Sequence, residues 1–143
     1  MTLYVYTDGA SRGNPGESAS GYLILDYRDR QLAKRVFYNG TCTNNVAEYK
    51  AIVAALKKAV SIRHEGEQLV LHSDSELVVN QLSGRYRVKD AGLRKLNLEA
   101  KRLLKRFGSY ELLAVRRENR HVSAVDKELN LFLDKNKLGE MHK

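Results

Sequence analysis

Two aspartates lie at predicted strand ends, where side chains of neighbouring strands can meet. Asp8 ends the first alternating segment of the chain, and Asp74 follows the fourth. In an open sheet such strand ends converge on one crevice, and two carboxylates held there repel each other unless a cation lies between them. Oxygen ligands of this kind favour a hard divalent ion. Each aspartate taken alone can equally be a turn or helix-capping residue.

Two further acids lie at the edges of apolar helix faces. Glu48 shares a helical stripe with Ile52 and Ala59, and Asp126 has Leu129 as its i+3 neighbour. An acid at such an edge is often simply solvated. Four of these acids in one basic protein predict metal-dependent chemistry on nucleic acid phosphates, because basic side chains hold the backbone while the acids hold the ions.

The charge of the chain indicates a polyanionic partner. Twenty-five Lys and Arg stand against 17 Asp and Glu, which gives a net charge of +8 and a pI near 9.6. Between Arg85 and Arg106 the only acids are Asp90 and Glu99. This segment favours binding to nucleic acid, although a solvated basic helix face is the alternative. The basic residues of the segment are Arg85, Arg87, Lys89, Arg94, Lys95, Lys101, Arg102, Lys105 and Arg106.

Length and composition predict one globular domain spanning residues 1–143. The sequence contains no run of 18 apolar residues and no secretory signal, so we expect no membrane association and a cytoplasmic location. Cys42 is the only cysteine, which excludes an internal disulfide and a zinc site built from several thiolates.

The elements that would position the acids follow from hydrophobic periodicity. Three strands predicted at 2–8, 21–27 and 32–40 form an antiparallel meander. A helix of about twenty residues begins near Thr43, which is a plausible N-cap. Strands then alternate with helices, which predicts an α/β fold with one mixed sheet and helices on its faces. These later elements are a strand at 68–72, helices at 76–82 and 93–107, a strand at 110–115 and a helix at 123–135.

Three segments carry a resemblance to a known family. They read TDGASRGNPG at 7–16, TNNVAEYKA at 43–51 and HSDSELVVNQL at 72–82. With these motifs in this order, the chain resembles type 1 ribonuclease H over essentially its whole length. The resemblance implies a five-stranded mixed sheet in which the first, fourth and fifth strands are parallel, with helices on both faces.

The resemblance also implies an activity. It predicts a monomeric endonuclease that hydrolyses the RNA strand of an RNA/DNA hybrid with two Mg²⁺ ions, leaving a 3′-hydroxyl and a 5′-phosphate. Mn²⁺ should replace Mg²⁺. By the resemblance Asp8 bridges both ions, Glu48 and Asp74 hold the ion beside the leaving oxygen, and Asp126 completes the other ion.

Family motifs further assign residues to the substrate. Short amides suit the 2′-hydroxyls displayed in the minor groove of an A-like duplex. For Asn44 and Asn45, helix capping is an alternative role. The implied contacts are Asn14, Asn44 and Asn45 in the minor groove, Ser11 and Gly13 in the loop near the RNA, and Thr43 in a DNA-phosphate pocket.

The chain departs from the family pattern at three places. Glu76 stands where many relatives have Gln; it can accept from a 2′-hydroxyl but adds negative charge. Arg116 occupies the position of a frequent active-site His, and His121 lies nearer the last acid, so a part for His121 in product release stays open. Asp126 comes about three residues later than usual. The chain also shows neither a hybrid-binding domain nor a long basic protrusion.

The sequence also allows other functions. The chain could be a non-catalytic hybrid-binding module, a different nuclease on the same fold, or an enzyme that also cleaves double-stranded RNA. The fourth acid has three competitors near the end of the chain, namely Glu118, Glu128 and Asp134. Helix phase favours Asp126, because we expect it in the first turn of the last helix, near the strand ends.

Overall fold

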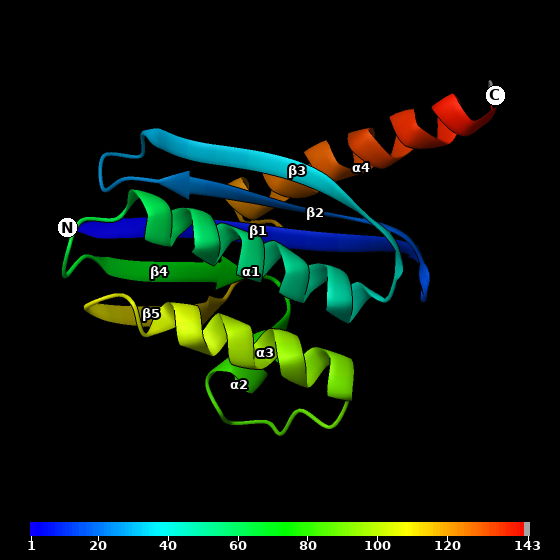
Figure 1. The fold of residues 1–143 in the computed structure, drawn as a ribbon. Helices are drawn as coiled ribbons and strands as arrows, with labels where there is room; N and C mark the ends of the chain where they lie inside the picture. The colour runs from blue at the N-terminus through cyan, green and yellow to red at the C-terminus, as the bar shows by residue number, and fades with distance from the viewer. Residues whose placement is uncertain (142–143) are drawn as a thin grey trace.

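The computed structural model describes the backbone of residues 1–141 and the side chains of residues 1–135. One mixed sheet has α1 and α3 on one face and α4 on the other (Figure 1). The elements in chain order are β1 (Thr2–Gly13), β2 (Gly16–Leu25), β3 (Gln31–Cys42), α1 (Asn44–Ile62), β4 (Gln68–Ser73), α2 (Glu76–Leu82), α3 (Ala91–Leu104), β5 (Ser109–Ala114) and α4 (Arg120–Met141).

The sheet confirms the predicted topology. Its strand order is β3-β2-β1-β4-β5, with β1, β2 and β3 antiparallel and β1, β4 and β5 parallel. The first strand is longer than predicted, because β1 and β2 stay paired from Tyr4↔Leu25 to Gly13↔Gly16. Gly13 has φ +118°, a conformation that glycine tolerates best, so it allows the tight return of the hairpin.

Two apolar clusters hold the layers together. The larger one joins α1 and α3 to the sheet and includes Val5, Ile52 and Leu71. The smaller one joins α4 to the opposite face through Val125, Leu129 and Leu133. Among the described residues, none of the helices has the combination of length and apolar character that a membrane span requires.

Helix α1 is fixed at its start and along its buried side. Thr43 caps it, accepting a hydrogen bond from the Val46 amide at 3.3 Å, as the sequence predicts. The buried Tyr49 hydroxyl donates to Gln81 Oε1 of α2 at 2.7 Å and accepts from Asn97 Nδ2 of α3 at 3.1 Å. This polar network connects three helices and sets the position of α1.

The start of α4 differs from the prediction. The helix begins at Arg120 rather than at 123, because Asn119 Oδ1 accepts hydrogen bonds from the amides of His121 and Val122, at 3.1 and 3.2 Å. The added residues place Asp126 in the second turn of α4, not the first as expected. The apolar residues predicted to face inward, Val125, Leu129 and Leu133, are buried.

Gly9 is a point of close approach between β1 and α1. A Cβ at this position would lie 2.4 Å from the Ala47 carbonyl carbon and 2.5 Å from the Glu48 nitrogen. Ser20 Oγ donates to the Ala47 carbonyl at 2.6 Å and holds the same turn of helix against the sheet. Even a methyl group would therefore force the first turns of α1 away from β1.

We expect Gly9→Ala to lower the free energy of unfolding by about 1–3 kcal/mol, because the added methyl group overlaps backbone atoms that have no room to move. Urea denaturation measures the change. Gly92→Ala is the control, since a Cβ there meets only Asp90 Oδ1, at 3.2 Å, and this substitution should be neutral or stabilising. Equal losses in both variants would contradict this role of Gly9.

Candidate functional site

The register of the sheet brings two predicted acids together. The last parallel pair between β1 and β4 is Tyr6↔His72. Asp8 and Asp74 each lie two residues beyond that pair, so they stand level with each other. β1 continues beside β2 there, whereas β4 ends at Ser73. The two carboxylates therefore lie where the parallel strands part.

Glu48 joins these two acids from α1. One carboxylate oxygen from each of Asp8, Glu48 and Asp74 lies within 4.8 Å of the others. Asp8 is 1% exposed and Glu48 is 8% exposed, while Asp74 is half-buried. The backbone of α1 lies against Gly9 of β1, and this contact positions Glu48 beside Asp8. We call these three residues the carboxylate cluster.

The cluster contains buried carboxylate oxygens without a partner. Both oxygens of Asp8 and Oε2 of Glu48 are inaccessible to solvent and accept no hydrogen bond. Burial raises the pKa of Asp8, and the charges of Glu48, Asp74 and Asp126 raise it further. Burial, followed by the charge of Asp74, also raises the pKa of Glu48. Unpartnered oxygens on crowded acids suit a hard divalent cation, so the donor set fits Mg²⁺ or Mn²⁺.

Asp126 faces the cluster from the opposite layer. It is half-buried in α4 and lines, with Glu48 and Asp74, an open cavity of about 520 Å³. Its Oδ1 accepts a hydrogen bond from Asn130 Nδ2 at 3.2 Å. Its oxygens fall outside the 4.8 Å group of the other three acids. Its side chain nevertheless lies near enough for its charge to raise the pKa of Asp8.

The three competitors of Asp126 occupy other surroundings. Glu128 forms an ion pair with Lys34, and Asp134 forms one with Arg12 at 2.6 Å. Glu118 is exposed and lines the neighbouring depression with Asp74 and Glu76, outside the cavity that Asp126 lines. Asp126 is therefore the acid of this group that faces the carboxylate cluster.

Arg117 is a residue of this site that the sequence analysis did not select. Its Nε lies 3.4 Å from Asp74 Oδ2, and its side chain is 73% exposed. The carboxylates of Asp74, Asp126 and Asp8 raise the pKa of its guanidinium, Asp74 most of all. The only sequence signal was a pair of arginines shortly before the last acid, which reads equally well as a solvated surface.

Hydrogen bonds join the predicted substrate residues of the hairpin and of α1. Asn44 Oδ1 accepts from the Ser11 amide at 2.9 Å, and Asn14 Oδ1 accepts from the Asn44 amide at 3.1 Å. Ser11, Asn44 and Asn45 line the same cavity as the acids. Gly13 lies in the same hairpin, and Thr43 caps α1 beside it.

Five of the predicted substrate and product-release residues do not line that cavity: Gly13, Asn14, Thr43, Glu76 and His121. Glu76 is exposed at the start of α2 and lines a neighbouring depression with Asp74 and Arg116. The His121 ring lies against Tyr6, with centroids 4.5 Å apart, and its Nε2 is 3.4 Å from Asp29 Oδ1. The structure thus brings Glu76 to the rim of the site but does not bring His121 to the cavity.

Arg12 connects the hairpin to the helix that carries the fourth acid. Its Nη2 donates to the Asn130 carbonyl at 3.1 Å and to Asn130 Oδ1 at 3.3 Å, and its Nη1 contacts Asp134. Asn130 in turn donates to Asp126. Hydrogen bonds and an ion pair therefore connect the tip of the β1–β2 hairpin to the middle of α4.

This fold and this set of acids define a domain of the ribonuclease H class. The crystal structure of RNase H1 from the halophilic archaeon Halobacterium salinarum superposes with a TM-score of 0.83 at 34% identity, covering 94% of this chain and 99% of that one. The sequence model of the family described as reverse transcriptase-like matches residues 6–125. The chain belongs to this family, within which it is a homologue of ribonuclease HI.

Other comparisons agree with this assignment. Ribonuclease HI of Halobacterium salinarum is 35% identical over 127 residues, which span 88% of this chain and 63% of that protein. The chain thus spans less than two thirds of this curated relative. LC11-RNase H1 in complex with an RNA/DNA hybrid matches with a TM-score of 0.75 at 30% identity, covering 92% of this chain and 99% of that one.

We expect Asp8→Asn to stabilise the metal-free protein in a pH-dependent way. Because the folded chain raises the pKa of Asp8, it binds more protons than the unfolded chain above about pH 4, and the stability contributed by this group falls as the pH rises. Urea denaturation in EDTA should show a gain of roughly 1–3 kcal/mol at pH 8 and little change near pH 3.

Glu118→Gln serves as the control for this experiment, since Glu118 is an exposed acid outside the cavity. It should change stability little at either pH. A loss of stability in Asp8→Asn at pH 8 would mean that the Asp8 carboxylate is a structural group.

Proposed function

We propose that the protein is a metal-dependent endoribonuclease that hydrolyses the RNA strand of RNA/DNA hybrids and leaves 3′-hydroxyl and 5′-phosphate ends. The observation that carries this proposal is the buried, unpartnered oxygen set of Asp8 and Glu48 beside Asp74. A similar solved structure, LC11-RNase H1, is in complex with an RNA/DNA hybrid, which supports the choice of substrate.

In this proposal the four acids hold two divalent ions. Asp8 would serve both ions, Glu48 and Asp74 would complete one site, and Asp126 would complete the other. Two bound Mg²⁺ ions would supply an activated water and would stabilise the leaving oxygen of an in-line displacement. The protein must keep the acids in place without metal, which the packing at Gly9 and the Tyr49 network achieve.

Arg117 has a defined electrostatic role in this arrangement. Its guanidinium partly neutralises Asp74 on the open side of the cluster, where a phosphate would enter. Because the side chain is exposed and long, it can leave Asp74 and donate to a phosphate oxygen. We assign it to substrate positioning rather than to metal binding.

The proposed substrate residues of the hairpin and of α1 are joined by hydrogen bonds beside the cavity, and we call them the substrate rim. Asn44, Asn45 and Asn14 present amides that can donate to and accept from sugar hydroxyls in the minor groove, with Ser11 and Gly13 beside them in the hairpin. Thr43 is assigned to a phosphate of the DNA strand. Glu76 lies across the cluster, where it can accept from a 2′-hydroxyl.

The proposal predicts that Mg²⁺ supports internal cleavage of the RNA strand of a labelled hybrid and that EDTA abolishes it. The reason is that the clustered carboxylates would repel a phosphate unless divalent ions neutralise them. Electrophoresis of products from hybrid, RNA/RNA and DNA/DNA duplexes measures the specificity. Undiminished cleavage in EDTA would contradict the metal mechanism. Binding without cleavage at any metal concentration would instead identify a hybrid-binding module.

Asp126→Asn should lower kcat on the order of 100-fold or more in Mg²⁺, with a smaller effect on hybrid binding, because it removes a proposed ligand and leaves the substrate rim intact. Single-turnover cleavage and anisotropy measure the two quantities. Glu128→Gln is a matched control in the same helix and removes only the ion pair with Lys34, so it should keep kcat within roughly threefold. Near wild-type cleavage by Asp126→Asn would contradict the ligand assignment.

A further inference from the structure

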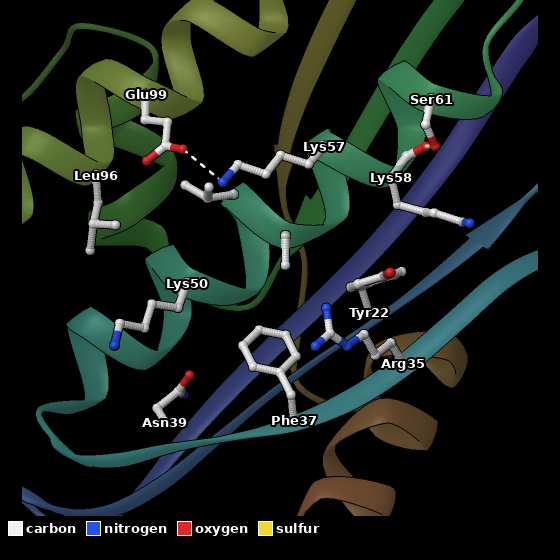
Figure 2. Close-up of a pocket in the computed structure, with 12 residues that line it drawn as sticks. Tyr22, Arg35, Phe37, Asn39, Lys50, Lys57, Lys58, Ser61, Leu96 and Glu99 are labelled. Carbon is white, nitrogen blue, oxygen red and sulfur yellow. Dashed lines mark hydrogen bonds and ion pairs between the residues drawn. The ribbon is translucent and has the colours of Figure 1, made fainter.

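A second concave surface lies apart from the carboxylate cluster. A shallow groove of about 630 Å³ runs over α1 and is bordered by β3 on one side and α3 on the other (Figure 2). It shares no lining residue with the cavity that contains the acids. We call it the α1 groove; none of its lining residues takes part in the function proposed above.

The sequence of α1 explains the shape of this groove. Lys50, Ala54, Lys57 and Ser61 recur at i, i+4, i+7 and i+11, so they lie on one face of the helix. Ala54 is small and leaves a depression between the two lysines. At 1.5 Å per residue the two lysine Cα atoms are about 10 Å apart along the helix axis.

The α1 groove is strongly basic. Four of its lining residues are cations, Arg35, Lys50, Lys57 and Lys58, and Glu99 is its only acid. Glu99 forms its ion pair with Lys57 at 3.0 Å, as Figure 2 shows. Among the described residues, the other three cations have no carboxylate within ion-pair distance. The groove therefore offers three uncompensated positive charges to an anionic ligand.

An aromatic side chain accompanies these charges. The half-buried ring of Phe37 rises from β3 toward α1, and Lys50 and Arg35 lie on either side of it in Figure 2. The Arg35 guanidinium is 4.8 Å from the centre of the ring. A basic groove with an accessible aromatic ring is typical of proteins that bind single-stranded nucleic acid, because phosphates follow the cations while unpaired bases stack.

We propose that the α1 groove binds a single-stranded nucleic acid, with phosphates at Arg35, Lys50 and Lys58 and a base against Phe37. A duplex does not suit this surface, because its bases are already stacked within the helix. Lys50 lies two residues after Glu48, which is a rotation of about 200° around α1, so the groove opens away from the carboxylate cluster. Binding of a free strand in the groove therefore does not depend on the proposed function.

The test uses the whole protein in EDTA with a labelled 12-nucleotide single-stranded DNA as the probe. Fluorescence anisotropy compares Lys50→Gln/Lys58→Gln with Arg28→Gln/Lys135→Gln, which removes the same charge from exposed positions outside the groove. We expect the groove variant to weaken the Kd roughly tenfold and the control less than twofold. Phe37→Leu should weaken it severalfold, because stacking is lost.

A blunt RNA/DNA hybrid is measured in parallel with the same variants, and circular dichroism verifies that they fold. The groove variant should bind the blunt hybrid as the control does. Equal weakening of single strand and hybrid would overturn the proposal and make the groove part of the hybrid surface. Equal weakening by both double variants, or unchanged affinity in Phe37→Leu, would also overturn it. Failure of the unaltered protein to cleave the hybrid would contradict the proposed function but not the binding of a single strand in the α1 groove.

Discussion

The main constraint on the site is the mutual repulsion of carboxylates that the fold holds together where two parallel strands separate. The register between β1 and β4 places Asp8 level with Asp74, two residues beyond the last paired residues of these strands. Glu48 is added from a helix whose backbone lies against Gly9. Buried charges of one sign without hydrogen-bond partners are costly in a folded protein. The stability of the surrounding core is what keeps these acids together before any ion binds.

The overall fold was predictable because the relevant signals are local. The alternation of apolar and polar residues predicted the three strands of the meander, and the helical periodicity of apolar residues predicted the helices. Thr43 predicted the start of α1, where the structure has it. The start of α4 was predicted three residues late because apolar spacing reports only the buried face. The cap residue, Asn119, lies outside that pattern in a polar stretch. Asp8 and Asp74 could be expected to meet because strand order determines which strand ends are neighbours.

The finer features of the site depend on distances between elements remote in sequence. Nothing in the local sequence indicates that Arg117 reaches Asp74, or that both oxygens of Asp8 lack a partner. The basic residues illustrate the same limit. The densest run of positive charge along the chain lies at 85–106, yet the α1 groove gathers its cations from α1 and β3, which the sequence analysis treated as structural elements. Charge density along a chain and charge density on a surface are different quantities.

The contact between Arg12 and Asn130 has a consequence for how the site responds to its surroundings. Asn130 holds both Arg12 of the hairpin and Asp126 of α4, so a shift at either end is transmitted to the other. Occupancy of the hairpin by a sugar-phosphate chain would then alter the affinity of the fourth acid for a cation. By thermodynamic reciprocity, binding of the cation would change the affinity of the hairpin for the sugar-phosphate chain by the same factor. A single asparagine thus links the hairpin, which we propose for the substrate, to the acid that we propose for the ion.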